Sequence, residues 1–304
     1  MAEIERVCVI GAGFMGQQIA TVAVMCGNIV TAFDPGPDAP AKAMEELKKI
    51  FALQGNQEQE KNLIEMKEKI KYCENLANAV ADTDLIIEAV PEKMDLKKEI
   101  LAQIDKEAPS SAIIASNSSS IPVVKLEDAI KRKDKVLNIH FDAPLIQRPM
   151  VDIMPGTATS NETIEKAIAW AESIGCVPVV VKKPIMGYLG NRLWRVVKRE
   201  SLMLWDEGYG DVTEIDRAWM LQFGVDLGPF AMMDAVGLDV VYDIEMAYYN
   251  ESGDPKDKPP DALKEMIDKG ELGLKTNKGF YNWSDPEFLK PDFLKKQKRK
   301  RREQ

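Results

Sequence analysis

The sequence is poor in the residues that build metal centres and disulfide frameworks. It contains one histidine, His140, and four cysteines, Cys8, Cys26, Cys73 and Cys176, none of which forms a C-x-x-C pair. A metal site with several histidines is therefore excluded, and any histidine chemistry has to use His140. Three of the cysteines lie in apolar runs, which is typical of reduced core thiols in a cytoplasmic protein.

Long hydrophobic runs are also missing. No stretch approaches the roughly 20 apolar residues that a membrane-spanning helix needs. The N-terminal apolar stretch has no basic segment before it and is interrupted by three glycines. We therefore expect neither a signal peptide nor a membrane anchor.

Basic residues are in the minority. The 304 residues include 40 Lys and Arg against 49 Asp and Glu, for a net charge of −9. The last ten residues alone hold seven basic side chains and one acidic one, so the rest of the chain is still more acidic. This balance argues against nucleic acid as the main partner. We predict that the tail, residues 285–304, is solvated and disordered.

Short apolar runs alternate with amphipathic stretches over the first 184 residues. The runs expected to be strands are Arg6–Ile10, Ile29–Phe33, Asp84–Val90, Ala112–Ser116, Val136–Phe141, Met150–Met154 and Val177–Val181. The stretches expected to be helices are Phe14–Cys26, Ala39–Phe51, Glu58–Ile70, Asp95–Glu107 and Glu162–Ile174. This alternation predicts an α/β fold with a Rossmann-like, doubly wound and mainly parallel sheet. Apolar runs without alternation fit a sheet that is covered on both faces.

The pattern changes after Lys183-Pro184, where long helical stretches follow and no strand is evident. The three expected helices are Leu189–Glu207, Thr213–Phe223 and Gly228–Tyr249. We therefore predict two domains, residues 1–184 and an all-α domain of residues 185–284. Met and Trp recur on the apolar faces of the helices, and part of that surface is expected to lie in a homodimer interface.

A dinucleotide-binding motif follows the first predicted strand. Gly11, Gly13 and Gly16 form G-x-G-x-x-G at the start of a helix, an arrangement that places a pyrophosphate at the helix N-terminus. Asp34 ends the second strand, 23 residues after Gly11, where a carboxylate binds ribose hydroxyls and repels a 2′-phosphate. The motif predicts NAD rather than NADP, with FAD as a weaker alternative.

His140 and Asp152 are the candidate acid–base pair. His140 ends a strand, and Asp152 lies twelve residues on within an apolar strand, where a buried acid needs a partner. Each also has a plain structural interpretation, as a satisfied core histidine or an edge-strand acid. Ser116–Ser120 follows another strand and offers hydroxyls to a substrate or caps to a helix. Asn191 similarly begins a helix, as a substrate contact or a cap.

Together these segments resemble the 3-hydroxyacyl-CoA dehydrogenase family over about residues 4–284. The motifs are GAGFMG at 11–16, EAVPEKMDLK at 88–97, SNSSS at 116–120, HFDAP at 140–144, GYLGNR at 187–192, LGPFAMMDAVGLD at 227–239 and GLKTNKGFYNW at 273–283.

The resemblance implies a role for each site residue. Residues implied to contact NAD are Gly11, Ala12, Gly13, Phe14, Met15, Gly16, Asp34, Glu92, Lys97, Ser119 and Lys275. Ser119 is also implied to contact the substrate. The resemblance makes His140 the general base and Asp152 its carboxylate partner, with Asn191 as a polar substrate contact. It also implies a dimer formed through the helical domain.

Three departures from the family pattern leave the substrate open. The family's dyad acid is usually Glu, and HFDAP replaces HFFNP, so that Asp142 and Ala143 stand in place of Phe and Asn. The serine and lysine that bind the CoA nucleotide have no clear match in residues 44–56. The segment from Arg148 to Asp152 is more similar to the lambda-crystallin and gulonate dehydrogenase branch, and Arg148 would then bind a free carboxylate. The C-terminal GLKTNKGFYNW, in contrast, is closer to the hydroxybutyryl-CoA branch.

Three functions are therefore considered. The first is NAD-dependent oxidation of a short (S)-3-hydroxyacyl-CoA, as in fatty acid metabolism, and the reverse reduction. The second is the same chemistry on a free hydroxy acid, and the third is a crystallin-like, nucleotide-binding structural protein. An intact His140 and Ser119 argue against the third.

Overall fold

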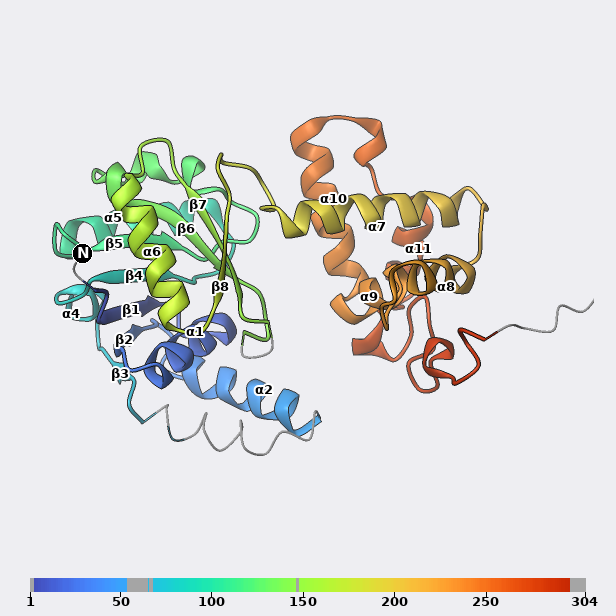
Figure 1. The fold of residues 1–304 in the computed structure, drawn as a ribbon, viewed down its shortest axis with the longest axis horizontal. Helices are drawn as coiled ribbons and strands as arrows, with labels where there is room; N and C mark the ends of the chain where they lie inside the picture. Colours follow the sequence, from blue (N-terminus) through green and yellow to red (C-terminus); the bar gives the residue numbers. More distant parts are fainter. Residues whose placement is uncertain (1–2, 54–64, 66–67, 146–147, 296–304) are drawn as a thin grey trace, which may run out of the picture. The chain divides into compact units, whose positions relative to one another are not determined.

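The structure is a computed structural model, which describes residues 3–53, 65, 68–145 and 148–295. The chain divides into two compact units, Met1–Leu189 and Gly190–Gln304. The first unit holds the sheet and the second is helical, so the predicted fold class is confirmed (Figure 1).

The first unit contains one eight-stranded sheet in the order β3-β2-β1-β4-β5-β6-β7-β8. All neighbouring strands are parallel except β6 and β7, which are antiparallel. The strands are β1 (Arg6–Ile10), β2 (Ile29–Phe33), β3 (Lys71–Tyr72), β4 (Leu85–Glu88), β5 (Ile113–Ser116), β6 (Val136–Phe141), β7 (Met150–Pro155) and β8 (Val177–Val180). The order reverses between β1 and β4, which is where ligands bind in open α/β sheets.

Helices cover both faces of this sheet. They are α1 (Phe14–Met25), α2 (Ala39–Leu53), α4 (Leu76–Val80), α5 (Met94–Glu107) and α6 (Asn161–Ser173). Along β1, Val7 and Val9 pack with residues of α1 and α6, whereas Cys8 and Ile10 pack with residues of α4 and α5. Successive side chains therefore enter opposite apolar layers, which explains why the strands lack polar alternation.

The second unit is built from helices around its own apolar core. They are α7 (Gly190–Asp206), α8 (Val212–Phe223), α9 (Pro229–Val236), α10 (Leu238–Ser252) and α11 (Asp261–Asp268). The single helix expected over Gly228–Tyr249 was wrong. It is split at Gly237, whose φ of +104° is open to glycine but strained for other residues, so the chain turns there into α10.

Two buried carboxylates organise the helical unit. Asp216 on α8 accepts hydrogen bonds from the first N–H groups of α9, those of Phe230 and Ala231, and from the Tyr281 hydroxyl. Asp234 on α9 accepts from the backbone of Phe280 and Tyr281 and from the indole of Trp283. The LGPFAMMDAVGLD and GLKTNKGFYNW motifs thus meet through carboxylates that satisfy otherwise unpaired donors.

Other sequence expectations had mixed outcomes. The two-residue strand β3 and the one-turn helix α4 were missed, because segments this short carry little periodicity. Most of the predicted helix Glu58–Ile70 and the end of the predicted tail, residues 296–304, lie outside the described residues. Among the described residues, no helix is long and apolar enough to cross a membrane.

The burial of Asp216 gives a pH-dependent contribution to stability. Burial raises the pKa of this carboxyl from 3.8 to about 6, even though three hydrogen bonds oppose the shift. Between these two pH values the folded state binds the proton more tightly than the unfolded state does. The protonated carboxyl therefore contributes to the free energy of unfolding fully below pH 3.8, and this contribution is lost as the pH rises through about 6.

We therefore expect Asp216→Asn to change the pH profile of unfolding. The free energy of unfolding of the unmodified protein, minus that of the variant, should be larger at about pH 4 than at about pH 7.5. Urea titrations at both pH values, followed by tryptophan fluorescence, measure this difference. A difference that stays constant or grows with pH would contradict the assignment.

Candidate active site

The glycine motif forms the turn between β1 and α1, and each glycine meets different surroundings. Gly11 has φ +97°, and a Cβ there would lie 2.6 Å from the Ala89 carbonyl oxygen. A Cβ on Gly16 would lie 1.8 Å from the Gly11 carbonyl oxygen. A Cβ on Gly13 would meet nothing within 4 Å. Gly11 and Gly16 therefore serve the chain's own packing, whereas Gly13 leaves open space in front of the backbone.

The turn suits the pyrophosphate of NAD. Its helix, α1, has no acidic residue in the first turn and no side-chain cap, so its positive end is not neutralised from within the helix. Ala12 is buried, while Gly13, Phe14 and Met15 are partly exposed beside the open space. These residues fit the phosphate-binding part of a dinucleotide site.

Asp34 follows β2 and holds the glycine turn. Its Oδ2 accepts a hydrogen bond from the Ala12 N–H at 2.8 Å, and its Oδ1 accepts from the Gly36 N–H at 2.8 Å. A carboxylate oxygen can accept more than one bond, so Asp34 retains capacity for ribose hydroxyls. The preference for NAD over NADP stays a prediction.

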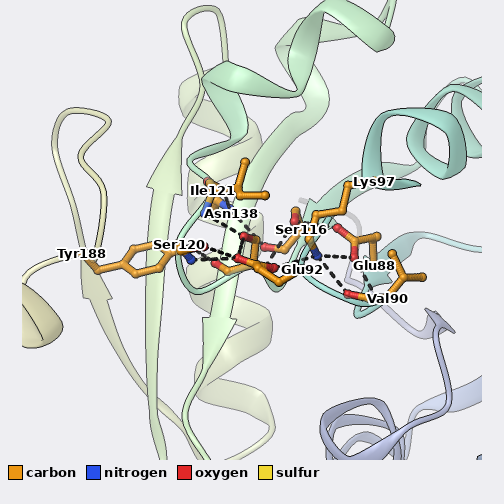
Figure 2. A network of polar contacts seen from close by, with 10 residues as sticks. Glu88, Val90, Glu92, Lys97, Ser116, Ser120, Ile121, Asn138 and Tyr188 are labelled. Atoms are coloured by element: carbon orange, nitrogen blue, oxygen red, sulfur yellow. Dashed lines mark hydrogen bonds and ion pairs between the residues drawn. The ribbon is translucent and has the colours of Figure 1, made fainter. Parts of the chain in front are cut away.

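A buried ion network lies at the carboxyl ends of β4 and β5 (Figure 2). The Lys97 ammonium is 1% exposed and contacts three oxygens, those of Glu88 Oε1 at 2.7 Å, the Val90 carbonyl at 3.1 Å and Glu92 Oε2 at 3.2 Å. All three of its donors are used. Lys97 therefore has no donor left for a ligand and acts through Glu92, and its direct contact with NAD stays a prediction.

Glu92 is the half-exposed end of this network. It accepts hydrogen bonds from the Ser118 hydroxyl and from both the N–H and the hydroxyl of Ser120. Burial alone would raise the pKa of Glu92, but Lys97 and the two serines outweigh it and lower the pKa below its usual value. Glu92 is therefore ionised at neutral pH and available to a ligand hydroxyl.

The serine loop after β5 leaves one hydroxyl for ligands. Ser116 donates to Glu88 and Ser118 to Glu92, whereas Ser119 is exposed and its hydroxyl has no hydrogen-bond partner in the described part of the chain. Asn117 accepts from the Phe141 N–H at 2.9 Å, which joins the loop to the strand that carries His140. The predicted role of Ser119 is compatible with this geometry and stays a prediction.

His140 and Asp152 face each other across the antiparallel pair β6 and β7, directly opposite in register. The Nδ1 of His140 lies 3.2 Å from Asp152 Oδ2, and both side chains are almost fully buried. With Nδ1 donating to the carboxylate, Nε2 is left as an acceptor, the state that a general base needs. The shorter Asp reaches the imidazole because the cross-strand pairing brings the two backbones close.

Two residues that sequence reasoning did not assign to the site also contact His140. Asp142 places its Oδ1 3.9 Å from Nε2, and the Tyr188 ring stacks on the imidazole with 4.6 Å between ring centroids. The replacement of HFFNP by HFDAP, which puts an acidic residue two positions after His140, is the sequence feature that could have indicated Asp142. Tyr188 lies within the GYLGNR motif, and nothing in the sequence pairs it with His140.

Asn191 and Lys275 belong to the helical unit. Asn191 is partly exposed in the first turn of α7, and the Lys275 ammonium forms an ion pair with Asp239 at 2.5 Å. The predicted contacts of Asn191 with substrate and of Lys275 with NAD stay predictions. Among the described residues, no group of three or more His, Cys, Asp or Glu side chains forms a metal site.

A Rossmann-type sheet, a glycine turn with an acidic residue after β2 and a buried His–Asp pair define an NAD-dependent dehydrogenase. Comparisons with known proteins identify the family. The 3-hydroxyacyl-CoA dehydrogenase NAD binding domain matches residues 6–184, and the C-terminal domain of the same family matches residues 187–283. The chain belongs to the 3-hydroxyacyl-CoA dehydrogenase family, and NAD rather than FAD is its cofactor.

Relatives match over nearly the whole chain. A probable 3-hydroxybutyryl-CoA dehydrogenase of Bacillus subtilis is 31% identical over 93% of this chain and 99% of its own length. The pig mitochondrial hydroxyacyl-coenzyme A dehydrogenase (Sus scrofa) is 32% identical over 92% of this chain and 91% of its own length.

Solved structures agree with these relatives. The (S)-3-hydroxybutyryl-CoA dehydrogenase of Ralstonia eutropha has a TM-score of 0.82 at 32% identity, and covers 92% of this chain and 99% of its own. A diketoreductase that acts on dicarbonyl compounds has the same TM-score at 34% identity and the same coverage.

The surroundings of Gly13 and Gly16 predict that substitution by alanine affects NADH binding at Gly13 and stability at Gly16. Gly16→Ala should lower the free energy of unfolding by about 1–3 kcal/mol or more, because the new Cβ collides with a backbone carbonyl. Gly13→Ala should leave unfolding nearly unchanged but weaken NADH binding by roughly 10- to 100-fold, since the methyl group fills the open space.

Thermal unfolding and NADH fluorescence titration of both variants test this pair. Each variant serves as the control for the other. If Gly13→Ala binds NADH as tightly as the unmodified protein does, the pyrophosphate does not occupy the space beside Gly13.

Proposed function

We propose that the protein oxidises a short-chain (S)-3-hydroxyacyl-CoA, of the hydroxybutyryl-CoA type, to the 3-ketoacyl-CoA with NAD, and catalyses the reverse reduction. The buried pair of His140, near the carboxyl end of β6, and Asp152 on β7 carries this proposal. The names of the relatives and of the Ralstonia structure support the substrate class.

His140 moves the proton in this mechanism. Its Nε2 accepts the proton of the substrate hydroxyl, and Asp152 stabilises the imidazolium that forms. Bound NAD supplies the hydride acceptor. In the reverse direction the imidazolium returns the proton to the developing alkoxide. Ser119 and Asn191 orient the substrate oxygen.

Substitution at the dyad tests the mechanism. His140→Gln should retain NADH affinity, because the glycine turn and Asp34 are unchanged, and should lower turnover by roughly 10²–10⁴-fold. Asp152→Asn should cause a smaller loss. Asp152→Glu should also lower turnover, because Asp152 already reaches Nδ1 at 3.2 Å and a longer side chain displaces the ring.

Steady-state oxidation of (S)-3-hydroxybutyryl-CoA, with NADH titrations as the control for folding, measures these effects. A His140→Gln protein with normal turnover would refute the assignment of the base.

The position of Asp142 supports a second candidate substrate class, the free hydroxy acids. It is half-buried beside Nε2 and accepts no hydrogen bond from the described residues, so an apolar group next to the carbinol carbon would desolvate a carboxylate. Arg148 is exposed and suited to a free carboxylate. A free hydroxy acid is therefore the second candidate substrate.

Asp142→Asn tests what this carboxylate does. The change removes the charge with little change in shape, so KM for 3-hydroxybutyryl-CoA should fall severalfold, about what 1 kcal/mol gives. The same assays should include free 3-hydroxy and sugar acids. A KM that rises, or turnover confined to free acids, would favour the second substrate class. NADH binding without turnover of any compound would favour a structural protein.

We also propose a cytoplasmic homodimer formed through the helical unit. The free cysteines support the compartment. Exposed apolar side chains support the dimer: Leu193 and Val196 lie one turn apart on α7, and Val240 and Ile244 one turn apart on α10. Such stripes are more apolar than a solvated helix face requires.

Sedimentation equilibrium at micromolar concentration should therefore give about twice the 34.0 kDa chain mass. Leu193→Glu combined with Val196→Lys should give the monomer, because the pair places charges in the interface. A 34.0 kDa species for the unmodified protein would count against the dimer.

A further inference from the structure

Tyr188 occupies a backbone conformation that a tyrosine rarely adopts. Its φ is +51°, in the left-handed region, and it follows Gly187 with φ +79°. The side chain is only 2% exposed. Non-glycine residues in this conformation are strained and persist where surrounding contacts hold them. The two contacts of Tyr188 show what holds it.

The first contact is with the base. The Tyr188 and His140 rings lie 4.6 Å apart between centroids and only 5° from parallel. Asp152 restrains one edge of the imidazole through Nδ1, over a long 3.2 Å bond. One hydrogen bond leaves the ring free to rock about it. A stacked aromatic plane removes that freedom, because rocking would break van der Waals contact over a whole face.

The second contact is with the serine loop. The Tyr188 hydroxyl donates to the Ser118 carbonyl oxygen at 2.5 Å, and Figure 2 shows the side chain pointing into the network around Glu92. Burial, followed by the charge of Asp152, raises the pKa of Tyr188 well above its usual value. The phenol therefore stays protonated and remains a donor throughout the working range, so it takes no part in proton transfer.

These contacts place Tyr188 between two parts of the reaction site. Ser118 directly precedes Ser119, whose free hydroxyl faces solvent, and Asn117 already joins the loop to the strand of His140 through the Phe141 N–H. A ring that stacks on His140 while its hydroxyl is fixed to Ser118 sets the distance between imidazole and serine loop.

We propose that Tyr188 is a positioning residue, which fixes the plane of the His140 ring and its place relative to the serine loop. The proposal rests on His140 being the base of the proposed function. Tyr188 makes no contact with the reacting atoms in this scheme. It excludes ring orientations in which Nε2 faces away from the substrate hydroxyl, and so it acts on turnover rather than on binding.

The single histidine makes this proposal directly measurable. In the full chain labelled with ¹³C-histidine and purified without a histidine tag, all imidazole signals belong to His140. The stacked phenol ring of Tyr188 should shift the NMR signals of the His140 ring protons upfield. Tyr188→Phe keeps the aromatic ring and should keep this shift, whereas Tyr188→Leu should lose it.

Tyr72→Phe and Tyr72→Leu are matched controls, since the Tyr72 hydroxyl also makes one hydrogen bond, to Gln17, far along the sheet on β3.

Kinetics supply the second readout. Tyr188→Phe should lower kcat by about two- to tenfold through the lost hydrogen bond, and Tyr188→Leu by about 10- to 100-fold through misplacement of the base. KM and the dissociation constant of NADH should stay within about twofold in both, since Tyr188 is only 2% exposed and contacts neither ligand in this scheme. The Tyr72 variants should retain kcat.

Three results would overturn the proposal. They are His140 signals at unchanged positions in Tyr188→Leu, an unchanged kcat in that variant, and equal losses of kcat and NADH affinity. If Tyr188→Leu fails to fold, the kcat of Tyr188→Phe still decides. If the unmodified protein turns over no hydroxyacyl-CoA, the proposed function fails, while the NMR comparison still shows whether Tyr188 fixes the ring.

Discussion

The site depends on one cross-strand pairing, that of β6 with β7. It is the antiparallel step in an otherwise parallel sheet, and it sets His140 directly opposite Asp152. In an antiparallel pair, residues directly opposite each other have Cα atoms about 4.5–5.5 Å apart, which lets the short Asp152 side chain reach the imidazole. The pair is almost fully removed from solvent, and the hydrogen bond from Nδ1 to Asp152 holds the imidazole in one tautomer. The surrounding apolar core serves to keep that register.

Carboxylates perform a second task throughout the molecule, which is to accept hydrogen bonds from backbone N–H groups where helices and strands end. Asp34 binds the glycine turn, and Glu92 binds the serine loop. Asp216 and Asp234 do the same between the helices of the second unit. Each acid replaces water as the partner of N–H groups that secondary structure leaves unpaired. Motifs that carry the family resemblance in the sequence, such as GLKTNKGFYNW, are in part explained by this structural role.

Much of the architecture could be predicted from the sequence. Strong apolar runs such as Arg6–Ile10 and Val136–Phe141 gave strands with correct bounds, and the glycine motif predicted its own turn. The break between α9 and α10 at Gly237 was not predicted, because the apolar periodicity of the sequence continues through it. Tyr188 escaped because its partners, His140 and Ser118, are distant in the sequence and meet only in the folded unit. Asp142 was noticed as a departure, but its distance to Nε2 needed the structure.

The central claim is that proton transfer passes through His140, and one comparison tests it most directly. Because the chain has a single histidine, the protonation of His140 can be followed by NMR over the same pH range as the rate of a single turnover of (S)-3-hydroxybutyryl-CoA oxidation. The account predicts that the two titrations share one midpoint in the enzyme–NAD complex. A rate whose pH dependence is unrelated to the titration of His140 would contradict it.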